Sequence, residues 1–346
     1  MTGPRVLICE DSQSYAAALR RELEYDGEAS VVAVCETAEQ AISALPELRP
    51  DLVTMDIELP GMDGLTAVAE IMSSSPVPIL VLSAHVGPGT DRAVGALAAG
   101  ALDVIAKQDL DLMNPAGAQG VAFRRRVRRL ALAKVISHPR AHPAIGASSS
   151  VPARAASVIG ICASTGGPQV LAAVLAALPA GYPIPLLVVQ HIAAGFTEGL
   201  ARWLETDTRL PVRIASDGEM AAPGAWIAPE GAHLRLSASG HLRLDRNTVA
   251  GQHRPSGDVL LRSIAATVGP GAVAVVLTGM GADGAEGAAE VRRRGGFVIA
   301  QDEASSAVYG MPAAAASHGV DAVLPPAGIA ARLLRLRHHP LPGTGR

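Results

Sequence analysis

The chain has 346 residues, which is long for one typical domain and comfortable for two, and its 49% of apolar residues can supply two cores. Aromatic residues make up only 3%, so these cores must be aliphatic. The formal net charge of −3 argues against a protein whose whole surface is built for nucleic acid.

The N-terminus carries no charged region followed by an apolar stretch, and no apolar run approaches the roughly 18 residues that a membrane-spanning helix needs. The three cysteines, Cys9, Cys35 and Cys162, are far apart and form no CxxC or Cys/His metal motif. We therefore expect a soluble cytoplasmic protein with buried, reduced thiols and no direct insertion into a membrane.

The first part of the chain alternates short aliphatic runs with stretches of helical spacing, which predicts a doubly wound α/β sheet. Buried parallel strands are expected at 5–10, 30–36, 51–56, 78–84 and 102–107. Helices are expected at 14–27 and 37–48, and a last helix should start near Gly120 and run to 136. We assign residues 1–122 to this first domain.

The composition then changes, because residues 137–157 are rich in Pro, Ser and Ala and have no apolar period. We interpret 123–155 as the end of the last helix followed by a flexible linker. A second domain is assigned to 156–338, and residues 339–346 are expected to form a disordered tail.

The second domain shows the same alternation of strand-like and helix-like segments. Its strands are expected at 157–164, 185–192, 272–280 and 296–301, and its helices at 171–179, 197–205, 257–268 and 285–295. Between them, residues 224–246 have turn residues between alternating runs, which predicts antiparallel β-hairpins inserted into a second doubly wound α/β domain.

Polar side chains end four of the strands expected in the first domain, where an open α/β sheet binds its ligands. They are Glu10 with Asp11, Asp56, Ser83 and Lys107. Three carboxylates in one crevice repel one another and need a hard cation such as Mg²⁺. A metal, a lysine and a hydroxyl together bind a phosphoryl group and favour attack on phosphorus by a carboxylate such as Asp56.

Residues 5 to about 120 resemble response-regulator receiver domains, which have a flavodoxin-like, five-stranded parallel fold. The motifs are CEDS, VTMDIELPGMDG, VLSA and VIAK. The resemblance implies that Asp56 is the phosphoacceptor and that Glu10 and Asp11 complete the Mg²⁺ site. It also implies that Ser83 is the switch hydroxyl and Lys107 the phosphate-sensing lysine.

Two positions depart from the receiver pattern. Gln108 follows the lysine, where receivers often have proline. Three residues before the lysine, where receivers often have Tyr or Phe, this chain has Val104. An aromatic rotamer switch is therefore not expected in this chain.

In the second domain, Ser164 follows a strand and precedes the glycines of a turn into a helix. A serine at such a turn is exposed, and free amides at a helix N-terminus can hold an oxyanion. A phosphate-binding loop would occupy the same place, but the segment has neither GxGxxG nor GxxxxGK[ST]. It also lacks the GxSxG elbow, because Cys162 stands at the first glycine.

A nucleophilic serine needs a base and a group that orients this base. His191 directly follows the run PLLVVQ and Asp283 lies in the loop after AVAVVL, so both are expected at strand carboxyl ends. Sequence spacing alone cannot choose the base and its orienting acid, because other histidines and aspartates could take these roles: His233, His241, His253, His318, Asp258 and Asp302.

Residues from about 156 to 335 resemble the catalytic domain of the chemotaxis protein-glutamate methylesterases/protein-glutamine glutaminases. The motifs are ICASTGGP, VVQHI, APEGAHL, HRPSGDVLL, VLTGMGADGA and AQDEASSAVYGMPAAA. The resemblance implies Ser164 as the nucleophile, His191 as the base and Asp283 as its orienting carboxylate. It suggests that amides near Thr165 and Met280 bind the oxyanion, and it implies no cofactor in this domain.

The resemblance further implies phosphorylation-activated hydrolysis of glutamyl γ-methyl esters, and deamidation of glutamines, on the cytoplasmic helices of methyl-accepting chemotaxis receptors. A chemotaxis histidine kinase would be the phosphodonor. One departure is Gly257, where the family often has valine, and it weakens a helix start.

Two rival functions remain. A DNA-binding response regulator is suggested by the basic run from Phe123 to Arg129, which we interpret as the solvent face of the last receiver helix. The second domain has no recognition-helix pattern, so no nucleic-acid partner is expected. A partner-binding module without esterase activity is the other rival, and the presence of all three triad residues disfavours it.

Overall fold

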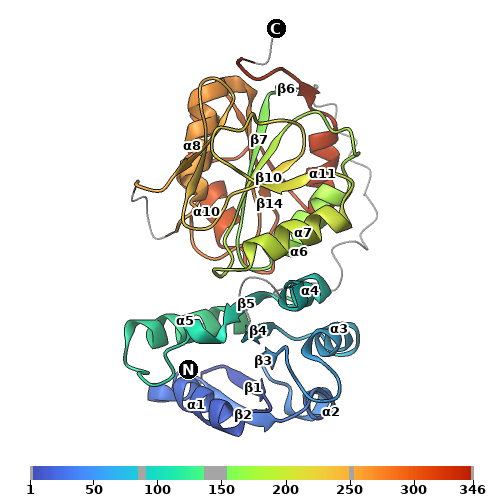
Figure 1. Ribbon diagram of the computed structural model, residues 1–346, viewed down its shortest axis with the longest axis vertical. Coiled ribbons are helices and arrows are strands. Elements are labelled where there is room, and N and C mark those ends of the chain that lie inside the picture. The colour runs from blue at the N-terminus through green and yellow to red at the C-terminus, as the bar shows by residue number, and fades with distance from the viewer. Residues whose placement is uncertain (1–2, 85–90, 136–153, 249–252, 344–346) are drawn as a thin grey trace. The chain divides into compact units, whose positions relative to one another are not determined.

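The computed structural model describes residues 3–84, 91–135, 154–248 and 253–343, which belong to two compact units (Figure 1). Within these residues, no helix is long and apolar enough to cross a membrane. All three cysteines are buried free thiols, as expected.

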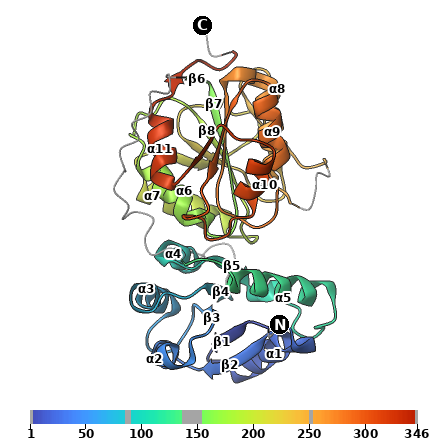
Figure 2. The same cartoon turned by 180° about the vertical axis from the view of Figure 1, so that it is seen from behind.

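The first unit is a five-stranded parallel sheet in the order β2-β1-β3-β4-β5, which confirms the predicted receiver fold. Helices α1 and α5 cover one face and α2, α3 and α4 the other (Figures 1 and 2). The strands are β1 (Arg5–Cys9), β2 (Ser30–Cys35), β3 (Leu52–Asp56), β4 (Ile79–Ser83) and β5 (Asp103–Ala106). The helices are α1 (Gln13–Leu23), α2 (Ala38–Leu48), α3 (Gly64–Ser74), α4 (Asp91–Ala99) and α5 (Ala118–Ala131).

Side-chain caps fix where the first three helices begin. Ser12, Thr37 and Asp63 each accept a hydrogen bond from a backbone N–H in the first turn of α1, α2 and α3. The prediction that α5 continues to 136 was wrong, because the helix ends at Ala131. Leu130 is its last fully buried side chain and Leu132 is 86% exposed, so no core contact holds a further turn.

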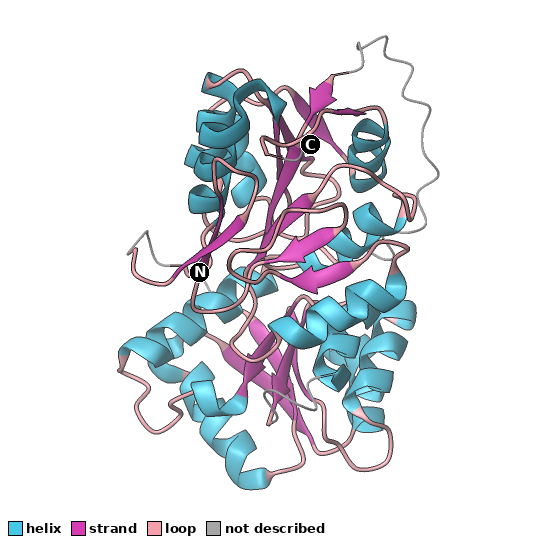
Figure 3. Cartoon of the chain, turned by 45° about the horizontal axis from the view of Figure 1, so that its top comes forward, coloured by secondary structure: helices cyan, strands magenta, loops and turns pink. Residues whose placement is uncertain are grey.

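The second unit is a seven-stranded parallel sheet in the order β15-β14-β13-β7-β8-β10-β9. Helices α6, α7 and α11 cover one face and α8, α9 and α10 the other (Figures 2 and 3). The strands are β7 (Val158–Ala163), β8 (Leu186–Gln190), β9 (Val212–Ile214), β10 (Ala225–Ile227), β13 (Ala272–Val276), β14 (Phe297–Gln301) and β15 (Ala322–Leu324). The helices are α6 (Gly167–Ala176), α7 (Thr197–Asp207), α8 (Gly257–Val268), α9 (Ala285–Arg293), α10 (Met311–Ser317) and α11 (Pro326–Leu334).

The predicted hairpins at 224–246 were only partly right. β11 (His233–Leu236) and β12 (Leu242–Asp245) form one antiparallel pair. However, β10 belongs to the main sheet and pairs in parallel with β8 and β9. All three residues of β10 are buried, which is typical of a central parallel strand rather than of a half-exposed hairpin.

The described ends of the second unit contact its core and each other. Most of the predicted linker, 136–153, lies outside the described residues, but β6 (Ala155–Ala156) pairs with β16 (Arg337–His338). Of the expected disordered tail, residues 339–343 belong to the described part of the chain and 344–346 lie outside it. Leu341 is only 5% exposed and joins the core under α8, so apolar burial fixes this segment.

Candidate functional site

Ser164 directly follows β7, in the middle of the seven-stranded sheet. Its N–H donates to the carbonyl of Thr278 (3.0 Å), and its carbonyl accepts from the N–H of Gly167 (2.8 Å). These bonds tie the serine to the loop after β13 and to the first turn of α6. Ser164 is only partly buried, so its hydroxyl can meet a substrate at the carboxyl edge of the sheet.

Strand pairing brings His191 next to Ser164. Ala163 and Gln190 are register partners of β7 and β8, and the N–H of His191 donates to the carbonyl of Ala163 (2.9 Å). The side chain of Gln190 is 4% exposed, and its Nε2 donates to the carbonyls of Ser164 and His191 (both 2.8 Å). One buried amide therefore clamps the two residues that follow the two strands.

Asp283 lies in the loop after β13, and the start of α8 holds its carboxylate. Oδ1 accepts from Oγ of Ser256 (2.7 Å) and from the N–H of Asp258 (3.1 Å), and Oδ2 accepts from the N–H of Gly257 (2.6 Å). Burial raises the pKa of Asp283, but the bonds from His191, Ser256 and Gly257 outweigh it and the pKa is lowered. The carboxylate is therefore anionic at neutral pH.

The imidazole of His191 meets this carboxylate directly. Nε2 of His191 lies 2.9 Å from Oδ2 of Asp283, and the two side chains are only 11% and 10% exposed. Both ring nitrogens of His191 are buried and neither makes a hydrogen bond of good geometry within the described residues, but only Nε2 lies in ion-pair contact with Asp283. The geometry leaves Nδ1 as the nitrogen that can exchange a proton with a substrate or a hydroxyl group.

The backbone amides of Thr165 and Met280, in the two loops that meet at Ser164, donate to no acceptor in the described part of the chain. The loop that carries Met280 approaches Ser164 closely at Gly279. A Cβ on Gly279 would lie 2.7 Å from Cβ of Ser164 and 2.4 Å from Sδ of Met311, so only glycine fits. Backbone amides without an acceptor, close to a reacting hydroxyl, are what an oxyanion hole requires.

Of the other candidate residues, His253 contacts the ring of His191, and the side chains of most of the rest bond to groups other than His191. His253 stacks on His191, as described below. His233 and His241 belong to the β11–β12 hairpin. Nε2 of His233 contacts the carbonyl of Thr248, and Nδ1 of His241 contacts the hydroxyl of Ser239. Asp258 accepts from the N–H groups of Gly284 (3.0 Å) and Gly287 (2.7 Å) at the start of α9.

The two remaining candidates are Asp302 and His318. Asp302 accepts from the N–H of Ser305 (3.0 Å) within a turn. His318 is exposed after α10 and lines a cavity beside Asp283.

The first unit brings its predicted site residues together at the carboxyl edge of its own sheet. Oxygens of Glu10, Asp11 and Asp56 lie within 4.8 Å of one another. Nζ of Lys107 lies 2.6 Å from Glu10 and 2.8 Å from Asp56. Three carboxylates at this spacing, two of them buried, fit a Mg²⁺ ion, which prefers oxygen ligands.

Charges in this pocket depend on one another. Burial, and then the charge of Asp56, raises the pKa of Glu10, although Lys107 acts in the opposite sense. Burial lowers the pKa of Lys107, but its bonds to Asp56 and Glu10 raise it more. Lys107 is therefore a firmly charged partner for an anion at Asp56.

Two neighbours complete the pocket. Ser83 ends β4 and is 4% exposed, beside the strand that ends in Asp56. The ring of Tyr15, on α1, faces Nζ of Lys107 at 4.5 Å. An aromatic ring therefore contacts the lysine although Val104 is aliphatic and fully buried.

Sequence reasoning missed four residues that shape the two sites: Gln190, His253 as a contact of His191, Ser256 and Tyr15. Only Ser256 had a visible signal, because a serine just before an expected helix is a good N-cap. Gln190 reaches its site through strand register, His253 through the return of a loop and Tyr15 through the packing of α1. Sequence spacing reveals none of these contacts.

Comparison with known proteins gives the family. The family model described as CheB methylesterase matches residues 159–333, and the response regulator receiver domain model matches residues 6–114. A protein-glutamate methylesterase/protein-glutamine glutaminase of Anaeromyxobacter dehalogenans is 43% identical and covers 95% of this chain and 98% of its own. A protein of the same name from Myxococcus xanthus is 44% identical, over 90% of this chain and 87% of its own.

A solved structure supports the same relationship. The crystal structure of the Thermotoga maritima CheB methylesterase catalytic domain is 39% identical, with a TM-score of 0.50, and covers 53% of this chain and 98% of that domain. Both matched regions follow the predicted order along the chain. This chain therefore belongs to the CheB methylesterase family, as a hydrolase that carries an N-terminal response-regulator receiver domain.

Proposed function

We propose that this chain hydrolyses glutamyl γ-methyl esters on methyl-accepting chemotaxis receptors with a triad of Ser164, His191 and Asp283. The observation that carries the proposal is the 2.9 Å contact between His191 and the anionic Asp283 at the sheet edge that also carries Ser164. A base oriented by a buried carboxylate next to a partly exposed serine is the arrangement that activates a serine nucleophile.

The reaction has two halves. Oγ of Ser164 attacks the ester carbonyl while Nδ1 of His191 takes its proton, and Asp283 stabilises the imidazolium that forms. The N–H groups of Thr165 and Met280 would hold the oxyanion. The imidazolium returns the proton to the leaving methanol, and water then cleaves the acyl-enzyme by the same route to give the free carboxylate.

Deamidation of glutamine follows the same steps. A glutamine side chain offers the same carbonyl, with ammonia in place of methanol as the leaving group. His191 must then protonate a poorer leaving group, so the ester should react faster than the amide.

The receiver domain is proposed to control this activity by phosphorylation of Asp56, with a chemotaxis histidine kinase as phosphodonor. Glu10, Asp11 and Asp56 would hold Mg²⁺, which neutralises charge as phosphorus is transferred. Lys107 and Ser83 would bind the phosphoryl oxygens. The added charge of about −1.5 to −2 is proposed to relieve an inhibition of the esterase by the unphosphorylated receiver. Because the receptor helices are cytoplasmic, the enzyme would act in the cytoplasm.

The test is the release of methanol from methylated receptor membranes, with and without a phosphodonor. Ser164→Ala should fold normally and lose nearly all release, because no other hydroxyl replaces the nucleophile. Ser239→Ala, in the turn between β11 and β12, is the matched control and should keep the wild-type rate. A Ser164→Ala variant with more than a few per cent of the activity would reject the triad.

A further inference from the structure

A second imidazole lies against the base of the proposed triad. The ring centroids of His191 and His253 are 4.2 Å apart and the planes differ by 17°, so the rings stack face to face. His253 comes from the segment before α8, whereas His191 follows β8. Within the described residues, His191 and His253 form the one pair of stacked aromatic rings.

The segment that presents His253 is anchored at its other end by the carboxylate of the triad. Three residues later, Ser256 donates its hydroxyl to Asp283, and the N–H groups of Gly257 and Asp258 donate to the same carboxylate. One short stretch of chain therefore contacts both His191 and Asp283.

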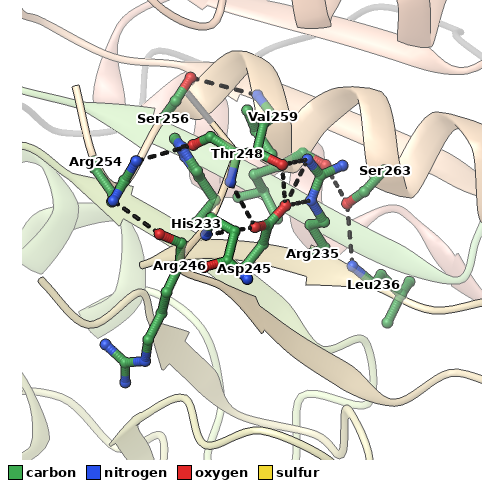
Figure 4. Close-up of polar contacts among 12 residues, drawn as sticks. His233, Arg235, Leu236, Asp245, Arg246, Thr248, Arg254, Ser256, Val259 and Ser263 are labelled. Carbon is green, nitrogen blue, oxygen red and sulfur yellow. Dashed lines mark hydrogen bonds and ion pairs between the residues drawn. The ribbon is translucent and has the colours of Figure 1, made fainter. Parts of the chain in front are cut away.

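The same segment is also held by the β11–β12 hairpin (Figure 4). The guanidinium of Arg254 donates to the carbonyls of Arg246 (2.9 Å) and Thr248 (3.0 Å). Asp245 fixes Thr248 by accepting from its N–H (2.9 Å), and the buried His233 contacts the Thr248 carbonyl at 3.1 Å. His253 is therefore the end of a braced segment rather than of a free loop.

We propose that His253 is a positioning residue whose ring holds the imidazole of His191 between Ser164 and Asp283. Stacking leaves both nitrogens of His191 free at the ring edge, where the carboxylate and the serine need them. A neutral ring on its face also favours the imidazolium that forms when Ser164 loses its proton, because a π face attracts a cation. The proposal rests on the proposed triad and adds a fourth residue to it.

The charges around His253 agree with a neutral ring. Burial lowers the pKa of His253, the neighbouring His191 lowers it further, and only Asp283 acts in the opposite sense. The cavity of about 490 Å³ beside this ring is lined by further titratable or charged groups: Asp258, Arg262, Glu286 and His318. Because the pKa is below its usual range, the ring of His253 is neutral at neutral pH.

The experiment compares two full-length variants, His253→Ala and His253→Phe, on methylated receptor membranes. His253→Ala removes the stacked ring and should lower kcat about three- to tenfold with little change in KM, because substrate binding is not involved. His253→Phe keeps an aromatic face and should retain most of kcat. The exposed His338, on β16, supplies the matched control His338→Ala, which should behave as wild type.

The second readout is the pKa of His191, followed by NMR in ¹⁵N-histidine-labelled protein. His253→Ala should lower this pKa, because the imidazolium loses the neutral ring that faces it, and His253→Phe should leave it near the wild-type value. A purely structural role would not move this pKa.

Three outcomes would overturn the proposal. The first is a wild-type kcat in His253→Ala. The second is a loss of kcat in His253→Phe equal to that in His253→Ala, which would mean a chemical role for the imidazole. The third is a raised pKa of His191 in His253→Ala. If wild type itself releases no methanol, the proposed function fails, and the NMR titration alone decides on the stacking.

Discussion

The substitution Asp283→Asn tests the proposed triad most directly, since it keeps the shape of the side chain and removes its charge. Oδ1 of Asp283 accepts from Ser256 and from the N–H of Asp258, and Oδ2 accepts from the N–H of Gly257 and faces His191. An asparagine offers an acceptor at only one of these two positions. Whichever way it turns, one buried backbone N–H loses its partner.

The cost in stability follows from this single orphaned donor. An unsatisfied buried N–H destabilises a fold by about 1–3 kcal/mol, so Asp283→Asn should lower the free energy of unfolding by that amount. The hydroxyl of Ser256 and the ring of His191 can each reverse their roles, and they should add little.

The cost in activity is larger. If the amide nitrogen faces His191, Nε2 must accept, so the proton moves to Nδ1 and the base is blocked. If the oxygen faces His191, the tautomer is kept but the imidazolium loses its counter-charge. Serine-protease triads lose about 10⁴-fold in kcat on this substitution, and we expect about 10³- to 10⁴-fold here.

The effect on stability should also depend on pH. The pKa of Asp283 is lower in the folded protein than the value of about 3.9 in an unfolded chain. Its contribution is therefore fully present above about pH 4 and is lost as the pH falls through the lowered pKa. The difference in stability between wild type and Asp283→Asn should therefore shrink as the pH falls below about 4.

The assay combines methanol release with urea unfolding followed by tryptophan fluorescence. Both tryptophans, Trp203 and Trp226, belong to the second unit, so their signal reports on this unit in the full-length chain. Asp258→Asn is the matched control, since it changes a carboxylate that contacts α9 and not His191. The reasoning is refuted if Asp283→Asn keeps more than about a tenth of kcat, or if Asp258→Asn loses as much.

Three further predictions concern the receiver, the loop at Ser164 and the coupling between domains. Acetyl phosphate with Mg²⁺ should label the wild type, whereas Asp56→Asn or EDTA should abolish the label; a label that persists in either case would contradict the pocket. Gly279→Ala should lower kcat at least tenfold, because its Cβ would lie 2.7 Å from Cβ of Ser164, and unchanged steady-state rates would show that the loop can yield. A fragment that starts near Ala153 should release methanol faster than the unphosphorylated full-length protein at equal concentration, and an equal or slower rate would rule out inhibition by the receiver.

The sequence was most informative for the candidate site residues that follow the ends of strands. Ser164, His191 and Asp283 each follow a buried aliphatic run, so their common location at one sheet edge could be predicted from the parallel order alone. The same holds for Asp56 and Lys107 in the receiver. Periodicity was sufficient here because the runs are four residues or longer and fully buried.

It was least informative where a contact depends on how distant segments meet. β10 has three residues, too few for its apolar pattern to distinguish a central strand from a hairpin. α5 ends at Ala131 although its apolar period continues, because Leu132 faces solvent. Gln190 and His253 act through strand register and loop return, and no local pattern encodes either.

The packing of Gly257 has an evolutionary consequence. A Cβ at this position would lie 2.6 Å from Sγ and 3.1 Å from Cβ of Cys162, so the thiol fills the volume that a side chain at 257 would need. The two positions must therefore covary: relatives with valine at the position of Gly257 should have a smaller residue, such as glycine, at the position of Cys162. Residues 162 and 257 therefore share one volume between β7 and α8.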